Sequence, residues 1–139
     1  MNKELREILE ESGCSCVIAN KGEVRSFHSR GVIDLLRLLH EEPGFLDGAE
    51  IADKVVGKGA AALMALGGIR EVYAVVLSKK AAGLLSQYGI AFSYGKLVDG
   101  IINRQGTGPC PVESLCSECA TAEECLPLIE NFVSSLNNK

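Results

Sequence analysis

The chain has 139 residues, 47% of them hydrophobic and 23% charged, and a formal net charge of −4. These values indicate one compact domain over residues 1–139 and argue against disorder. The acidic balance and the absence of Trp argue against nucleic acid as a partner, and no apolar run is long enough to cross a membrane. The charged segment Met1–Glu7 lacks the apolar core of a secretory signal, so we expect a cytoplasmic location and reduced cysteines.

The first third of the chain is expected to hold a helix, a β-hairpin and a second helix. Leucine and isoleucine at helical spacing predict the first helix, and the turn sequence Asn20-Lys21-Gly22 predicts the hairpin. Pro43-Gly44 is expected to stop the second helix. The expected elements are a helix over Lys3–Glu11, strands over Cys14–Ala19 and Val24–His28, and a helix from Ser29, as its cap, to His40.

The middle of the chain is expected to alternate strands and helices. The run Val72–Leu77 is apolar without a break, which is typical of a strand buried on both faces in a parallel sheet. The expected elements are strand Ala49–Lys54, helix Gly57–Leu66, strand Glu71–Leu77, helix Lys79–Tyr88 capped by Ser78, and strand Ile90–Tyr94.

The C-terminal part is expected to form a helical extension from about residue 110. Cys110-Pro111-Val112-Glu113 opens a short helix with proline at its first position, and Thr121-Ala122-Glu123-Glu124 is a capping box for the last helix. The order of elements predicts an α/β fold with a mixed five-stranded sheet, built from the hairpin and parallel strands, and helices on both faces.

The same order resembles the cytidine-deaminase-like fold, a three-layer sandwich. The segment Asp53–Ala74 is similar to the second zinc-motif helix of deaminases and the strand after it, without their cysteines. The whole chain resembles an uncharacterised family with this fold, domain-of-unknown-function family 1893, and the resemblance implies a homodimer. The pieces that carry it are Arg30-Gly31, Asp53-Lys54 with Gly57-Lys58, Ser78 to Ala81, Asn103-Arg104, and Cys110-Pro111-x-Glu113.

Standard zinc deamination is not expected from this sequence. That chemistry needs a His-x-Glu or Cys-x-Glu motif and two cysteines at Cys-x-x-Cys spacing. Here the hairpin leads into His28-Ser29-Arg30, so Arg30 stands where the proton-transferring Glu would be. Gly57-Lys58-Gly59 stands near the place of the cysteines. We therefore expect no zinc and no other cofactor.

Glycines and lysines around residue 57 predict an anion subsite. Glycines at a helix start leave backbone N–H groups free, and the helix dipole favours an anion there. Lys54 and Lys58 are four residues apart and are expected to reach it, and Arg104 suits a carboxylate or phosphate. The alternative is that the small residues only permit close packing while both lysines are solvated.

Cys110 and Glu113 form a second candidate site. As the N-cap of its helix, Cys110 is a candidate nucleophile, or Glu113 is a candidate general base. The alternative is a capping box in which Glu113 binds the Cys110 N–H and the thiol is inert. The pattern Cys-x5-Cys-x2-Cys-x5-Cys, which starts at Cys110, also has enough thiolates for a structural zinc.

These polar residues collect where strands give way to helices, which is where open α/β sheets bind ligands. The sequence therefore predicts a pocket for a small anionic or nucleotide-like ligand, and it leaves open whether a hydrolase or transferase reaction takes place there. The alternative function is a redox- or metal-responsive module that uses Cys110, Cys116, Cys119 and Cys125. The catalytic candidates are Asp53, Cys110 and Glu113, and the ligand-binding candidates are Arg30, Lys54, Gly57, Lys58, Ser78, Asn103 and Arg104.

Overall fold

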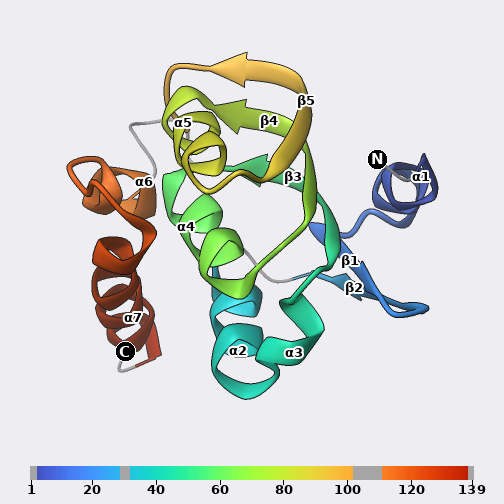
Figure 1. Ribbon diagram of the computed structural model, residues 1–139, viewed down its shortest axis with the longest axis horizontal. Helices are drawn as coiled ribbons and strands as arrows, with labels where there is room; N and C mark the ends of the chain where they lie inside the picture. The colour runs from blue at the N-terminus through green and yellow to red at the C-terminus, as the bar shows by residue number, and fades with distance from the viewer. Residues whose placement is uncertain (1–2, 29–31, 102–110, 138–139) are drawn as a thin grey trace.

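The computed structural model describes residues 3–28, 32–101 and 111–137. Seven helices and five strands lie within these residues (Figure 1). In chain order they are α1 (Lys3–Ser12), β1 (Cys16–Asn20), β2 (Glu23–Phe27), α2 (Ile33–Glu41), α3 (Pro43–Leu46), β3 (Glu50–Val56), α4 (Lys58–Gly67), β4 (Glu71–Ser78), α5 (Lys79–Gln87), β5 (Ala91–Val98), α6 (Pro111–Cys116) and α7 (Ala122–Asn137).

The strands form one mixed sheet in the order β2-β1-β3-β4-β5. The hairpin strands β1 and β2 are antiparallel, and β1 also pairs antiparallel with β3. Strands β3, β4 and β5 are parallel, with helices α4 and α5 as the crossovers. The predicted mixed five-stranded sheet and the predicted alternation of strands and helices are therefore confirmed.

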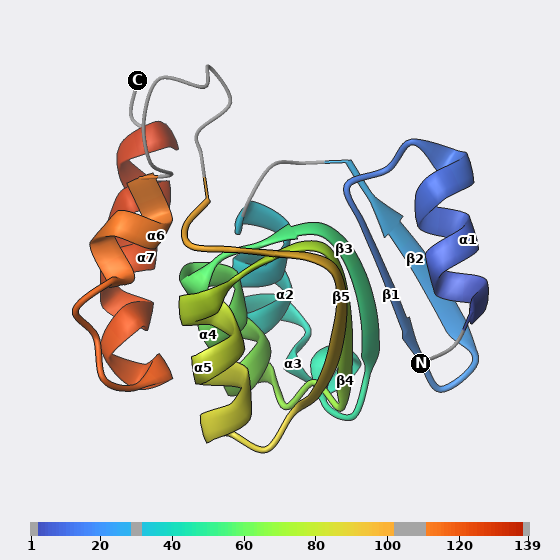
Figure 2. The same ribbon diagram turned by 90° about the horizontal axis from the view of Figure 1, so that it is seen from above.

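Helices cover both faces of the sheet. Figure 2 shows α1 on one face and α2, α4 and α5 on the other. The first face is sealed by a small cluster in which Leu5 and Leu9 of α1 pack with Val17, Ala52 and Tyr73 of the strands. The C-terminal helices α6 and α7 lie beyond α4, so they add a layer outside the sandwich.

Helix α4 occupies the centre of the larger core. It packs against α2, α5, α6, α7 and β3, so it has almost no free face. This explains why most of its residues are alanine or glycine, with Leu63, Met64 and Leu66 as its large apolar side chains, because more bulky residues would push its neighbours apart. The close approach of α6 and α7 to α4 is the feature that shapes the site described below.

Several expected boundaries differ from the structure, most of them by one or two residues, and three differences are informative. The residue at the N-cap position of α2 is Val32, whose side chain makes no capping hydrogen bond, and the expected cap Ser29 lies outside the described residues. Pro43 does more than end α2, because it also starts the short helix α3. Strand β5 continues to Val98, beyond the expected end at Tyr94, because its later residues pair in parallel with β4. None of the described helices is long and apolar enough to cross a membrane.

Candidate functional site

The carboxylate of Glu113 joins four parts of the chain at the carboxyl ends of the parallel strands. Glu113 lies in the first turn of α6 and is only 6% exposed. Its Oε2 accepts hydrogen bonds from the Lys58 N–H (2.7 Å) and the Ser78 hydroxyl (2.6 Å). Its Oε1 accepts one from the Ile101 N–H (2.7 Å). Glu113 thus ties α6 to the start of α4, the end of β4 and the chain that follows β5.

The start of α4 therefore binds a carboxylate of its own chain. Unpaired N–H groups at a helix start attract negative charge, and Glu113 supplies it here. A Cβ atom at Gly57 would lie 2.9 Å from Glu113 Oε2, and one at Gly59 would lie 2.3 Å from Cγ1 of Val112. These glycines let α6 pack directly onto the first turn of α4. An added ligand at this helix end would have to displace Glu113.

The side chain of Lys58 reaches the opposite end of α6. Its Nζ donates hydrogen bonds to the carbonyl oxygens of Ser117 (3.2 Å) and Cys119 (2.5 Å). Lys58 is only 8% exposed, and no carboxylate of the described residues forms an ion pair with it. Buried lysines are rare unless a partner neutralises them. Lys58 is therefore a buried cation whose described acceptors are neutral carbonyl groups.

A pocket of about 180 Å³ lies beside this ammonium group. Lys58 and Lys80 stand in the first turns of α4 and α5, directly after the neighbouring parallel strands β3 and β4. The side-chain amide of Gln87 donates to the carbonyl oxygen of Ala120 (3.2 Å) and connects α5 to the segment before α7. The lining residues are Lys58, Lys80, Gly83, Leu84, Gln87, Cys119 and Ala120.

A larger hollow of about 400 Å³ lies at the opposite ends of the strands, around the hairpin turn. Its lining includes Glu50 and Arg70, whose side chains form an ion pair. The charges of these two residues therefore neutralise one another. The Lys58–Lys80 pocket differs, because no ion pair is found for either of its lysines among the described residues.

Asp53 is a second buried carboxyl group, on β3. It is 8% exposed and stands opposite Cys16 of β1 in the antiparallel ladder. Burial raises the pKa of Asp53 to about 7, although hydrogen bonds from the backbone of Val55 and Lys54 act in the opposite direction. Burial, and then the charge of Asp53, raise the pKa of Cys16. Asp53 can exchange a proton near neutral pH, but it does not line the Lys58–Lys80 pocket.

Cys116, Cys119 and Cys125 form a thiol cluster next to the pocket. After burial, interactions with the Cys116 and Cys119 thiols raise the pKa of Cys125 further. Cys116 and Cys125 are fully buried, and burial raises the pKa of each. Cys119 is partly exposed and lines the pocket. All three are free thiols, and no group of three or more His, Cys, Asp or Glu residues in the described parts is arranged to hold a metal ion.

Comparison with protein families identifies the family of this chain. Residues 4–133 match the family described as "TM1506: Domain of unknown function (DUF1893)". The chain belongs to the DUF1893 family. The predicted resemblance to this family is therefore confirmed. A comparison with curated proteins gave no match.

Two solved structures are similar to this DUF1893 chain. The crystal structure of a DUF1893 family protein (TM1506) from Thermotoga maritima is 26% identical, covers 94% of this chain and 91% of its own, and gives a TM-score of 0.84. The apo dCMP deaminase of the cyanophage S-TIM5 is 13% identical, covers 70% of this chain and 100% of its own, and gives a TM-score of 0.49.

The structure brings together some of the predicted site residues of this DUF1893 protein. Gly57, Lys58, Ser78 and Glu113 meet at the start of α4, where Ser78 also caps α5 by accepting a hydrogen bond from the Ala81 N–H. Lys54 is exposed on β3, and Asp53 is buried in the same strand. Four further predicted residues lie outside the described residues, namely Arg30, Asn103, Arg104 and Cys110.

Sequence reasoning did not assign Lys80 and Gln87 to the site. A signal for Lys80 was present, because it follows β4 as Lys58 follows β3, and adjacent parallel strands place such residues at one edge of the sheet. Gln87 carried no such signal, since its place in the pocket depends on how α6 and α7 pack. The Cys110 N–H, which Glu113 was expected to bind as the alternative, lies outside the described residues. The described donors to Glu113 are three groups on other elements.

Proposed function

We propose that this protein binds a small anionic ligand, phosphate or the phosphate group of a nucleotide-like molecule, in the Lys58–Lys80 pocket at the carboxyl ends of β3 and β4. One observation carries the proposal: a lysine that is 8% exposed and lacks a described carboxylate partner lines a pocket together with a second lysine. An anion there would neutralise a charge that the described residues leave unpaired.

The chemistry of the lining supports this class of ligand. An ammonium group has three donors, and Lys58 uses two of them on the carbonyl groups of Ser117 and Cys119. Lysine is a common phosphate binder that acts as a point charge. The volume of about 180 Å³ accommodates a phosphate group but not a whole nucleotide. The remainder of a nucleotide would therefore lie outside the pocket.

The proposal does not include zinc-dependent deamination and assigns no reaction. Arg30 and the sequence Gly57-Lys58-Gly59 stand where the zinc chemistry of deaminases needs a glutamate and cysteines. Asp53 has a protonation equilibrium near neutral pH that suits acid–base chemistry, but it does not line the pocket. The proposed function is therefore ligand binding.

Two neighbouring lysines allow a matched test. Lys80 lines the pocket, whereas Lys79 forms an ion pair with Asp99 (2.8 Å) on the exposed surface. Binding of inorganic phosphate and of a nucleoside monophosphate would be measured by calorimetry, with the parent nucleoside as the ligand without phosphate. We expect Lys80→Ala to weaken binding about tenfold, as the loss of about 1.4 kcal/mol requires, and Lys79→Ala to bind like the wild type.

Equal phosphate affinity in the Lys79→Ala and Lys80→Ala proteins would overturn the proposal. So would the absence of binding by the wild type at millimolar phosphate, or tighter binding of the parent nucleoside than of its monophosphate. Both substitutions remove one positive charge from the first turn of the same helix, so a general electrostatic effect would change them equally.

A second candidate function is a redox-responsive module. The observation that favours it is the packing of three cysteines in one core cluster, with Cys116 and Cys125 buried and Cys119 partly exposed. The metal-responsive form of this idea receives no support from the described residues, since none of their groups is arranged to hold a metal. Elemental analysis and thiol titration before and after mild oxidation would separate the two forms. Retention of all thiols after oxidation would exclude the redox form.

A further inference from the structure

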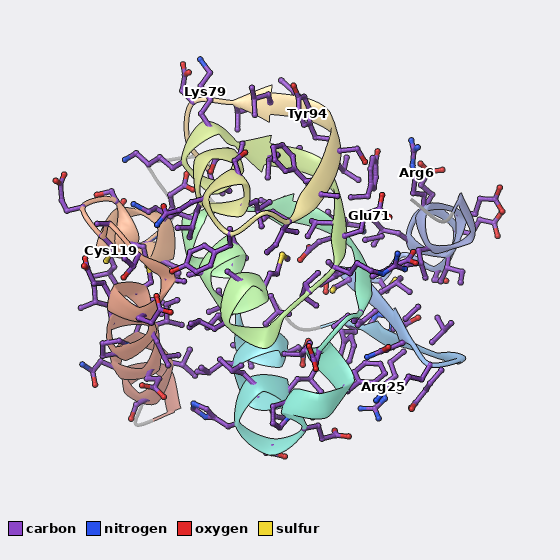
Figure 3. The ribbon with its side chains drawn as sticks, in the orientation of Figure 1. Arg6, Arg25, Glu71, Lys79, Tyr94 and Cys119 are labelled. Atoms are coloured by element: carbon purple, nitrogen blue, oxygen red, sulfur yellow. The ribbon has the colours of Figure 1, made fainter. Side chains whose placement is uncertain are left out.

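The sheet face that carries α1 is covered over only part of its width. Helix α1 packs on β1 and β3 and reaches Tyr73 of β4, where the Arg6 guanidinium lies 4.2 Å from the centre of the ring. Figure 3 labels Arg6 on α1. Among the described residues, α1 is the helix on this face, and it does not extend to β5 (Figure 2). The uncovered surface of β4, β5 and the end of β3 is called the open half below.

The open half carries apolar side chains that solvent reaches. Val55, Val76 and Lys96 stand side by side in the strand register. The residues after the two valines, Val56 and Leu77, are buried in the larger core, so the valine side chains and Lys96 point to the α1 side. Val55 is 45% exposed, and Val76 is partly exposed. Neighbouring valines on an uncovered sheet face are typical of an interaction surface, because a sheet buries its apolar face against another layer.

We propose that the open half binds α1 of a second copy of this chain in a symmetric dimer. A two-fold axis parallel to the strands, between α1 and the open half, places the helix of each copy on the open half of the other. The two helices then lie side by side in one layer between the two sheets. The step between α1 and the bare strands is therefore complementary to itself, which favours a second copy over a foreign partner.

Charge complementarity supports the same arrangement. Leu5 and Leu9 turn one side of α1 to its own sheet, so the exposed Glu7 and Glu10 point away from it, toward the second copy. Lys96 is exposed and is the only charged residue of β5. The acidic side of α1 would therefore meet Lys96 of the partner subunit, and symmetry repeats this contact.

The size of the surface sets the expected strength of the dimer. Two strands of eight residues and a helix of ten residues offer a flat area of roughly 400 Å² per copy. Standard protein interfaces bury about 800 Å² per partner, and smaller ones belong to weak complexes. We therefore expect a reversible dimer with a dissociation constant on the order of 10 µM.

Sedimentation equilibrium of the full chain, between about 1 and 500 µM, measures this association. The wild type should change from the mass of one chain to that of two. Val55→Asp should weaken association at least about tenfold, because it places a carboxylate in the apolar contact. Leu115→Asp is the matched control and should associate like the wild type. Leu115 is 44% exposed and lies on α6, on the other side of the molecule (Figure 2).

Substitutions that reverse a charge test the pairing of Lys96 with α1. Lys96→Glu should weaken association about tenfold, and adding Glu7→Lys and Glu10→Lys to the same chain should restore it. Glu11→Lys is the control, because it changes the charge of α1 at an exposed position on the flank opposite Arg6. It should leave the dissociation constant unchanged.

Three outcomes would overturn the dimer. They are a wild type that keeps the mass of one chain at about 500 µM, a Val55→Asp protein that associates like Leu115→Asp, and a Lys96→Glu protein that associates like Glu11→Lys. The Lys58–Lys80 pocket is formed by α4, α5 and the turn before α7, on the other face of the sheet. Phosphate binding by Val55→Asp should therefore equal that of the wild type, so the dimer and the proposed function are tested separately.

Discussion

Replacing Glu113 by Gln tests whether this carboxylate holds the carboxyl ends of the strands together. The substitution preserves the size of the side chain but turns one acceptor oxygen into an NH₂ donor. In one orientation the new NH₂ group faces the Ile101 N–H, and in the other it faces the Lys58 N–H. Either orientation sets donor against donor inside the protein.

The expected loss follows from the three hydrogen bonds. A hydrogen bond to a charged group contributes about 1.5–3 kcal/mol, and a buried donor left unpaired costs about 1–3 kcal/mol. Glu113→Gln loses one bond and weakens the other two by removing the charge, while it relieves the cost of burying that charge. We therefore expect the free energy of unfolding to fall by about 3 kcal/mol. Glu113→Ala leaves all three donors unpaired and should lower it further.

Urea unfolding followed by circular dichroism measures this loss, and hydrogen exchange at the amides of Lys58 and Ile101 locates it. Glu118→Gln is the control, because Glu118 is exposed on the turn after α6 and its substitution should change the free energy by less than about 0.5 kcal/mol. A Glu113→Gln protein as stable as the control, with unchanged protection of both amides, would refute the reasoning.

Two further predictions concern a glycine and a buried acid. Gly59→Ala should lower the free energy of unfolding by about 1–3 kcal/mol, because the added Cβ would clash with Val112. Gly83→Ala should raise it by about 0.5–1 kcal/mol, because nothing lies within 4 Å of the added Cβ and alanine is the better helix former. Chemical unfolding measures both changes. The folded protein binds the Asp53 proton more tightly than the unfolded chain, since burial raises the pKa of Asp53 from 3.8 to about 7. The free energy of unfolding should therefore fall between about pH 4 and 7, by on the order of 4 kcal/mol relative to Asp53→Asn, and parallel pH profiles for the two proteins would contradict this.

Local signals in the sequence were enough to predict most of the fold. The apolar run Val72–Leu77 predicted the central strand β4, because a strand between two neighbours and two helix layers is apolar on both faces. Gly68 and Gly89 follow the ends of α4 and α5 with φ of 80° and 70°, a backbone conformation that favours glycine. The end of β5 was missed, because its last residues owe their strand conformation to β4 and not to their own preference.

The roles of the site residues were likewise predictable only where the hydrogen-bond partner is near in the sequence. The Ser78 cap was predicted because its partner, the Ala81 N–H, is three residues away. The role of Glu113 was not predicted, because its partners Lys58 and Ser78 are 55 and 35 residues away along the chain. A local pattern favours the nearest available donor for a carboxylate. The packing of α6 on α4 brings distant donors to Glu113, and no residue spacing within either segment indicates that packing.

Lys58 holds both ends of α6, and this has a consequence for the pocket. Its backbone N–H binds Glu113 in the first turn of α6, and its ammonium binds the carbonyl groups of Ser117 and Cys119 after the last turn. A helix of six residues is too short to be stable alone, so these contacts at both ends support it. They also fix the ammonium group before any ligand arrives. An anion that enters the pocket therefore meets a cation already in position, which lowers the entropy cost of binding.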